Sequence, residues 1–189
     1  MEKPTLYSEI ESIHKEILHF RRELHRYPEL SFREKESSDR IARMLEQEGI
    51  PFERVATTGI LARIDGKTTS DRPVVLRADI DALPVTEETG LDFTSENPGV
   101  MHACFYDFHA ASLLRASLVL SRHRNDSVGP VSGLFKQREE QHPGEQPNVL
   151  KEGGCDGRTP VAFIRPPGPP ASQTGEFGLR PGWHWTLGD

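Results

Sequence analysis

Segments with helical periodicity alternate with short apolar segments along the first two thirds of this 189-residue chain. Apolar side chains at helical spacing predict a helix over residues 8–26, and Pro28 ends it because the residue before a proline is pushed out of the helical region. Ser31 and Glu34 have the spacing of a capping box, which predicts the start of a second helix. Gly49 is suited to the left-handed conformation that ends such a helix.

Strands and a further helix are expected next. The run Val74-Val75-Leu76 is apolar without alternation, as is typical of a strand buried on both faces. We expect strands at 52–55, 60–64 and 73–78, a helix at 109–123, weaker strands at 131–135 and 161–164, and the end of a helix at 149–152. This order predicts an α/β fold, layered as helix–sheet–helix, with a mostly parallel or mixed sheet.

Composition separates the two ends of the chain. Residues 129–189 hold 11 Gly and 9 Pro, a level typical of poor order. The net charge of −6 argues against a basic surface for nucleic acid. No apolar run approaches the roughly 20 residues of a membrane helix, and the N-terminus lacks a signal-peptide core. Cys104 and Cys155 are too few for a disulfide framework, so reduced thiols in the cytoplasm are expected.

Two acidic pairs follow predicted strands, where sites in α/β proteins usually lie. Asp79 and Asp81 can bind a cation or orient an imidazole, or they form an ordinary solvated strand end. Glu139 and Glu140 allow one carboxylate to ligate a metal while the other acts as a general base toward water, or they are ordinary surface charges. Spacing alone leaves both alternatives open.

A third group lies in residues 102–109, which contain two imidazoles, a thiol, a phenol and a carboxylate. The thiolate of Cys104 and neighbouring imidazoles suit a borderline-soft divalent ion. The spacing matches no zinc-finger pattern, so a polar loop that precedes a helix is the alternative.

Short motifs along the chain resemble those of the aminoacylase-type metal-dependent amidohydrolases. This family includes hippurate hydrolases, N-acyl-amino-acid amidohydrolases and indole-acetyl-amino-acid hydrolases. The resemblance is dense to about residue 104 and patchy beyond it. It is carried by Arg21–His25, Pro28–Phe32, Thr58-Gly59, Arg77–Pro84, Met101–Cys104, Glu139-Glu140, Asp156-Gly157 and Gly178–Gly182.

The resemblance implies an α/β catalytic domain with a two-metal site and a smaller satellite domain that dimerises. It implies hydrolysis of the amide bond of N-acyl amino acids or small peptides with Mn, Zn or Co. By the same resemblance, Cys104 is the bridging thiolate, Glu140 a metal ligand and Glu139 the general base that activates water. Asp81 is a supporting residue near the metals.

The chain departs from the resembled motifs at several positions. Phe105 stands where the family has glycine, and its ring is expected to obstruct the site. Tyr106 replaces a ligand histidine and is a poor neutral ligand. Arg165 replaces a second ligand histidine with a permanent cation. Only His102 or His109 is near enough to substitute for a lost imidazole, so we expect weak metal binding and little hydrolysis.

Two hypotheses follow for the whole chain. Residues 1–128 are expected to be the N-terminal part of the catalytic domain, and residues 129–189 a degenerate, Gly/Pro-rich continuation of it. The closing segment and the satellite dimerisation domain are expected to be absent. The first hypothesis is a metal-dependent amidohydrolase, impaired in this chain. The second is a non-catalytic remnant, truncated or frameshifted.

Overall fold

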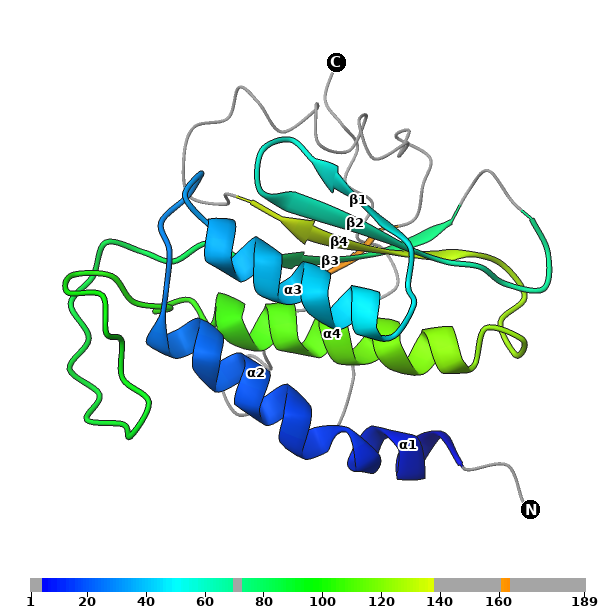
Figure 1. The fold of residues 1–189 in the computed structure, drawn as a ribbon, viewed down its shortest axis with the longest axis horizontal. Helices are drawn as coiled ribbons and strands as arrows, with labels where there is room; N and C mark the ends of the chain where they lie inside the picture. Colours follow the sequence, from blue (N-terminus) through cyan, green and yellow to red (C-terminus); the bar gives the residue numbers. More distant parts are fainter. Residues whose placement is uncertain (1–4, 70–72, 138–160, 164–189) are drawn as a thin grey trace.

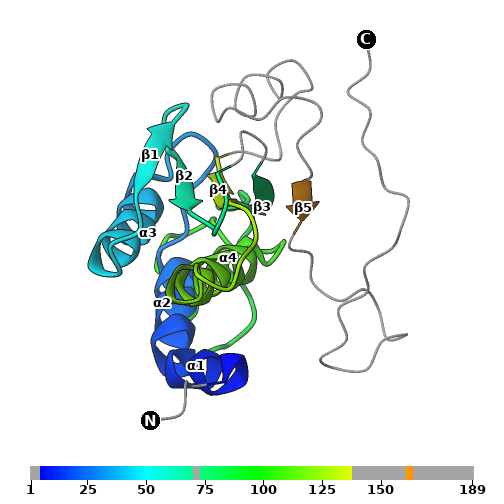
Figure 2. The ribbon, with the colours of Figure 1, turned by 90° about the vertical axis from the view of Figure 1, so that its right-hand side faces the viewer.

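The computed structural model describes residues 5–69, 73–137 and 161–163. Their helices and strands form a mixed α/β arrangement in which the described helices lie on one side of the sheet (Figures 1 and 2). The elements are α1 (Leu6–Ser12), α2 (His14–Arg26), α3 (Lys35–Gln47), β1 (Phe52–Val55), β2 (Gly59–Ile64), β3 (Val74–Asp79), α4 (Tyr106–Arg122), β4 (Val131–Lys136) and β5 (Val161–Phe163). The predicted α/β class and its mixed sheet are confirmed.

The sheet has the strand order β1-β2-β4-β3-β5. The β1–β2 and β2–β4 pairs are antiparallel, whereas the β3–β4 and β3–β5 pairs are parallel. Helix α4 connects β3 to β4 and packs beneath them, α3 lies beside β2, and α2 packs against α4 (Figure 2). The carboxyl ends of β3 and β4 therefore point the same way at the centre of the sheet.

The predicted boundaries agree closely with the observed ones, with two differences. The helix expected over 8–26 is divided at Ile13, whose φ of −98° and ψ of 1° separate α1 from α2. Helix α4 begins at Tyr106, three residues before the expected start. Gly49 has the expected positive φ of 65°. The helix end expected at 149–152 lies outside the described residues.

The start of α3 is capped differently from the prediction. Glu34 is the N-cap residue but its side chain makes no capping hydrogen bond. Instead, the Glu29 carboxylate accepts hydrogen bonds from the backbone N–H groups of Glu36, at 3.2 Å, and Ser37, at 2.8 Å. The predicted capping box is wrong because Ser31 and Glu34 both turn toward the sheet edge, where other polar groups bind them.

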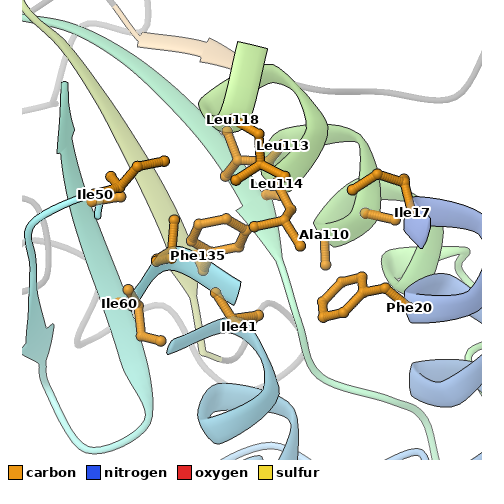
Figure 3. Packing of buried hydrophobic residues seen from close by; sticks show 14 of the residues in the cluster. Ile17, Phe20, Ile41, Ile50, Ile60, Ala110, Leu113, Leu114, Leu118 and Phe135 are labelled. Atoms are coloured by element: carbon orange, nitrogen blue, oxygen red, sulfur yellow. The ribbon is translucent and has the colours of Figure 1, made fainter. Parts of the chain in front are cut away.

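The core lies between the sheet and the helices. Phe135 of β4 is fully buried and points toward Leu113 and Leu114 of α4 and Ile60 of β2 (Figure 3). Burying each such side chain stabilises the fold by roughly 1.5–3 kcal/mol. None of the helices in the described part combines the length and hydrophobicity needed to cross a membrane.

Candidate functional site at the carboxyl ends of β3 and β4

The parallel pairing of β3 with β4 brings two of the predicted polar segments together. Asp79 pairs with Lys136 in the register, and the Ile80 N–H donates to the Lys136 carbonyl at 3.1 Å. The chain therefore leaves β3 toward Asp81 and leaves β4 toward Gln137 at the same edge of the sheet. This edge is where α/β folds usually place ligands.

Backbone hydrogen bonds hold the turn that carries Cys104 at the same edge of the sheet. The backbones of Leu83 and Met101 exchange two hydrogen bonds, of 2.9 and 3.0 Å. The Phe105 N–H then donates to the His102 carbonyl at 3.1 Å, which closes the turn before α4. The structure thus brings the segment after Asp81 beside the residues that lead to Cys104, which is partly exposed.

Neither aspartate of the Asp79–Asp81 pair is a solvated strand end. Asp81 is fully buried, and its Oδ2 accepts a hydrogen bond from the Ser31 hydroxyl at 2.7 Å. Asp79 is also buried and is held by the Arg77 guanidinium, whose Nη2 lies 2.7 Å from Asp79 Oδ1. Burying carboxylates requires partners, and these two have them.

A buried polar chain that the sequence did not reveal lies at the same edge. The Gln137 side-chain oxygen accepts hydrogen bonds from the backbone N–H groups of Thr57, at 3.1 Å, and Thr58, at 2.7 Å. The Thr58 hydroxyl lies 2.8 Å from that oxygen and 2.7 Å from Glu34 Oε2. These contacts join the turn between β1 and β2 to the start of α3 and the end of β4.

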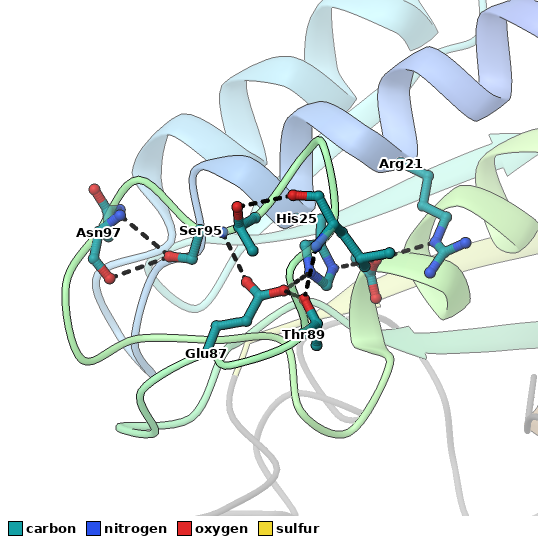
Figure 4. Close-up of polar contacts among 9 residues, drawn as sticks. Arg21, His25, Glu87, Thr89, Ser95 and Asn97 are labelled. Carbon is teal, nitrogen blue, oxygen red and sulfur yellow. Dashed lines mark hydrogen bonds and ion pairs between the residues drawn. The ribbon is translucent and has the colours of Figure 1, made fainter.

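A second polar cluster holds the start of α4. His25 Nδ1 lies 3.0 Å from Asp107 Oδ2, and His25 Nε2 lies 3.0 Å from Glu87 Oε1. Arg21 donates to Asp107 Oδ2 at 3.0 Å. Glu87 in turn accepts a hydrogen bond from the Ser95 N–H at 2.7 Å (Figure 4). This cluster ties the loop around residues 87–95 to α2 and α4.

The charges in this cluster support each other. The hydrogen bond to Asp107 raises the pKa of His25 against the opposing effect of burial. Burial alone would raise the pKa of Asp107, but the hydrogen bond from His25 and the nearby cations lower it. Because each ring nitrogen of His25 faces a carboxylate oxygen, the imidazolium form satisfies both contacts.

His102 behaves differently from His25. It is only 2% exposed, and burial lowers its pKa to about 4. Neither ring nitrogen has a hydrogen-bond partner among the described residues. His102 is therefore a neutral imidazole, the protonation state that a metal ligand needs.

Phe105 occupies a strained backbone conformation at the start of α4. Its φ of 60° and ψ of 28° are left-handed, the region that favours glycine. Its side chain is largely exposed, at 54% of the maximum. Residue 105 thus has a backbone conformation suited to glycine, although the residue is phenylalanine.

The described residues do not by themselves fit a metal ion. Within residues 5–69, 73–137 and 161–163, no three His, Cys, Asp or Glu side chains converge on one point. Glu139, Glu140 and Arg165 lie outside the described residues. Of the predicted site residues, the structure brings Asp81 and the turn of Cys104 to one edge of the sheet and places Tyr106 at the first position of α4.

Comparisons with known proteins show a family and several relatives that this chain is similar to. The sequence model of Peptidase family M20/M25/M40 matches residues 75–182. The N-acetylcysteine deacetylase of Bacillus subtilis is 42% identical over 149 residues, which cover 77% of this chain and 38% of the relative. The N-acyl-L-amino acid amidohydrolase of Geobacillus stearothermophilus is 37% identical over 158 residues, which cover 83% of this chain and 42% of the relative.

Among solved structures, the YXEP protein of Bacillus subtilis, described as a dinuclear metal binding peptidase from the M20 family, is 38% identical with a TM-score of 0.70. The match covers 76% of this chain and 40% of that structure. The chain thus spans about two fifths of the length of the relatives that it matches.

Proposed function

Because the chain belongs to peptidase family M20/M25/M40, we propose that it is part of a hydrolase that cleaves the amide bond of N-acyl amino acids or small peptides. Two relatives carry names with this chemistry, a deacetylase of N-acetylcysteine and an amidohydrolase of N-acyl-L-amino acids. The presence of only two cysteines favours a reducing compartment such as the cytoplasm.

The observation that carries the proposal is the meeting of three segments at one sheet edge. The segment after β3 bears Asp81, the turn hydrogen-bonded to Leu83 leads to Cys104, and the chain leaving β4 reaches Glu139 three residues after its last strand residue. In this proposal Glu139 is the general base toward water, and Cys104 and Glu140 are ligands of a divalent metal such as Mn, Zn or Co. Asp81 is a supporting residue.

We also propose that this chain performs the reaction poorly. Tyr106 is the first residue of α4, where the resemblance places a ligand imidazole, and a neutral phenol is a weak metal ligand. The alternative function, a non-catalytic remnant of such an enzyme, is favoured by the same observation.

The test combines metal binding with turnover. Mn²⁺ affinity and release of free amino acid from N-acetylcysteine are measured on the purified chain and on the double variant Phe105→Gly/Tyr106→His. Restoring the imidazole is expected to raise Mn²⁺ affinity and to increase turnover, because a neutral imidazole is a far better ligand than a neutral phenol.

Two controls separate the alternatives. Glu139→Gln should abolish whatever turnover is present, while Glu46→Gln, the same change on an exposed part of α3, should leave it intact. Turnover that survives Glu139→Gln would contradict the role given to Glu139. A double variant that neither binds Mn²⁺ nor turns over would favour the remnant.

A further inference from the structure

Glu34, Thr58 and Gln137 form a buried chain of hydrogen bonds. The Thr58 hydroxyl makes two contacts in this chain but has only one proton to donate. Gln137 Oε1 is oriented by the backbone N–H groups of Thr57 and Thr58, so the oxygen of this amide, not its nitrogen, faces Thr58. The Thr58 hydroxyl lies 2.8 Å from this oxygen and 2.7 Å from Glu34 Oε2. A hydroxyl has one proton, and it can serve only one of these two acceptors.

The short contacts of the Thr58 oxygen with both neighbouring oxygens therefore favour a second donor in the chain. If Glu34 were ionised, either the Gln137 oxygen or the carboxylate would face a lone pair of Thr58 at hydrogen-bond distance. If Glu34 is a neutral acid, its O–H donates to Thr58 Oγ1, and the Thr58 hydroxyl donates to Gln137 Oε1. Every contact is then a hydrogen bond with its own proton.

Burial and charge favour the same state. Glu34 is fully buried, Thr58 is 2% exposed and Gln137 is 6% exposed. Burial raises the pKa of Glu34, the negative charge of Asp81 raises it further, and the hydrogen bond from Thr58 and nearby backbone N–H groups only partly oppose this. A buried carboxyl group without a cationic partner is less costly when it is neutral.

The position of these three residues ties them to the candidate site. Gln137 directly follows β4, and the Ile80 N–H that precedes Asp81 donates to the Lys136 carbonyl. Holding the Gln137 side chain therefore fixes the end of β4 at the sheet edge that bears Asp81.

We propose that Glu34, as a neutral acid, and Thr58 are positioning residues that hold Gln137 and thereby the end of β4, at the sheet edge that also bears Asp81.

The test uses the full chain and the variants Glu34→Gln and Glu34→Leu, with Glu46→Gln and Glu46→Leu on the exposed part of α3 as matched controls. An amide at position 34 keeps an N–H donor for Thr58, whereas leucine keeps the approximate volume and removes the donor. Thr58→Val, which removes the hydroxyl, is the second route if Glu34→Leu fails to fold.

Infrared difference spectra identify the protonation state. The wild type is expected to show the carbonyl stretch of a protonated carboxylic acid near neutral pH, absent in Glu34→Gln and retained in Glu46→Gln. A spectrum in which Glu34→Gln removes only carboxylate bands would overturn the neutral-acid assignment.

Amide hydrogen exchange at Thr57 and Thr58 measures how stably their N–H groups are hydrogen-bonded to the Gln137 side chain. Losing one hydrogen bond from the chain is expected to accelerate exchange there by about 5- to 10-fold in Glu34→Leu or Thr58→Val, with little change in Glu34→Gln or the controls. Unchanged exchange in Glu34→Leu and Thr58→Val would refute the positioning role.

Discussion

The left-handed backbone of Phe105 yields a sharp prediction about stability. With φ of 60° and ψ of 28°, a side chain with a Cβ is held in a region that costs an L-residue about 1–2 kcal/mol. We compare Phe105→Gly with Phe105→Ala. Both variants remove the largely exposed ring, so the loss of its contacts cancels and only the Cβ distinguishes them.

The expected difference combines two effects of opposite sign. Glycine avoids the left-handed penalty, but its greater freedom in the unfolded chain costs about 0.5–1 kcal/mol. The net result favours Phe105→Gly over Phe105→Ala by about 1 kcal/mol. For a chain of this length, that corresponds to a melting temperature higher by about 2–4 °C.

The assay is equilibrium unfolding in urea, with the midpoint compared at an unchanged slope. Ala116→Gly is the control, because Ala116 lies inside α4, where the ordinary helical preference makes glycine about 1 kcal/mol less stable than alanine. Glycine should thus give the more stable protein at position 105, and alanine at position 116. A Phe105→Ala variant as stable as Phe105→Gly would refute the reasoning.

Three further predictions concern buried charge and close packing. His25 has a raised pKa in the folded state, so its stabilising contribution is complete below the unfolded pKa of about 6.5 and is lost as the pH rises through the folded value. Urea midpoints should therefore fall more steeply in the wild type than in His25→Gln as the pH rises above about 6.5. Asp107→Asn removes the carboxylate shared by His25 and Arg21 and should cost about 3 kcal/mol, and a loss near zero in urea unfolding would contradict the pairing. Gly66→Ala would place a Cβ 2.3 Å from the Gly129 carbonyl oxygen and should lower the free energy of unfolding by about 2 kcal/mol, whereas Gly129→Ala, whose Cβ meets nothing within 4 Å, should change it little; equal effects would argue against the contact.

Much of the fold could be predicted because its signals are local. The apolar run Val74–Leu76 forms the first half of β3, but Val74 is exposed and Leu76 is only partly buried, so the expected burial on both faces holds for Val75 alone. The left-handed stop at Gly49 is where the sequence predicts it. The division between α1 and α2 was missed because Ile13 continues the apolar periodicity although its own backbone leaves the helical region.

The candidate site could be predicted only in part. The motifs around Asp81 and Cys104 come together at one edge of the sheet, since one follows β3 and the other precedes α4. The roles of His25 and Glu34 were missed. No spacing within their own segments indicates a polar partner, because the partners come from distant parts of the chain.

Sequence by itself determined the family and, apart from the division between α1 and α2, the order of helices and strands. These properties depend on neighbours along the chain or on motifs of a few residues. Tertiary structure alone decided that His25 meets Asp107, 82 residues away, and that Gln137 meets Thr58, 79 residues away. The free energy of burying a charge depends on the groups that are packed around it. The protonation of His25, Glu34 and His102 is therefore a property of the folded protein.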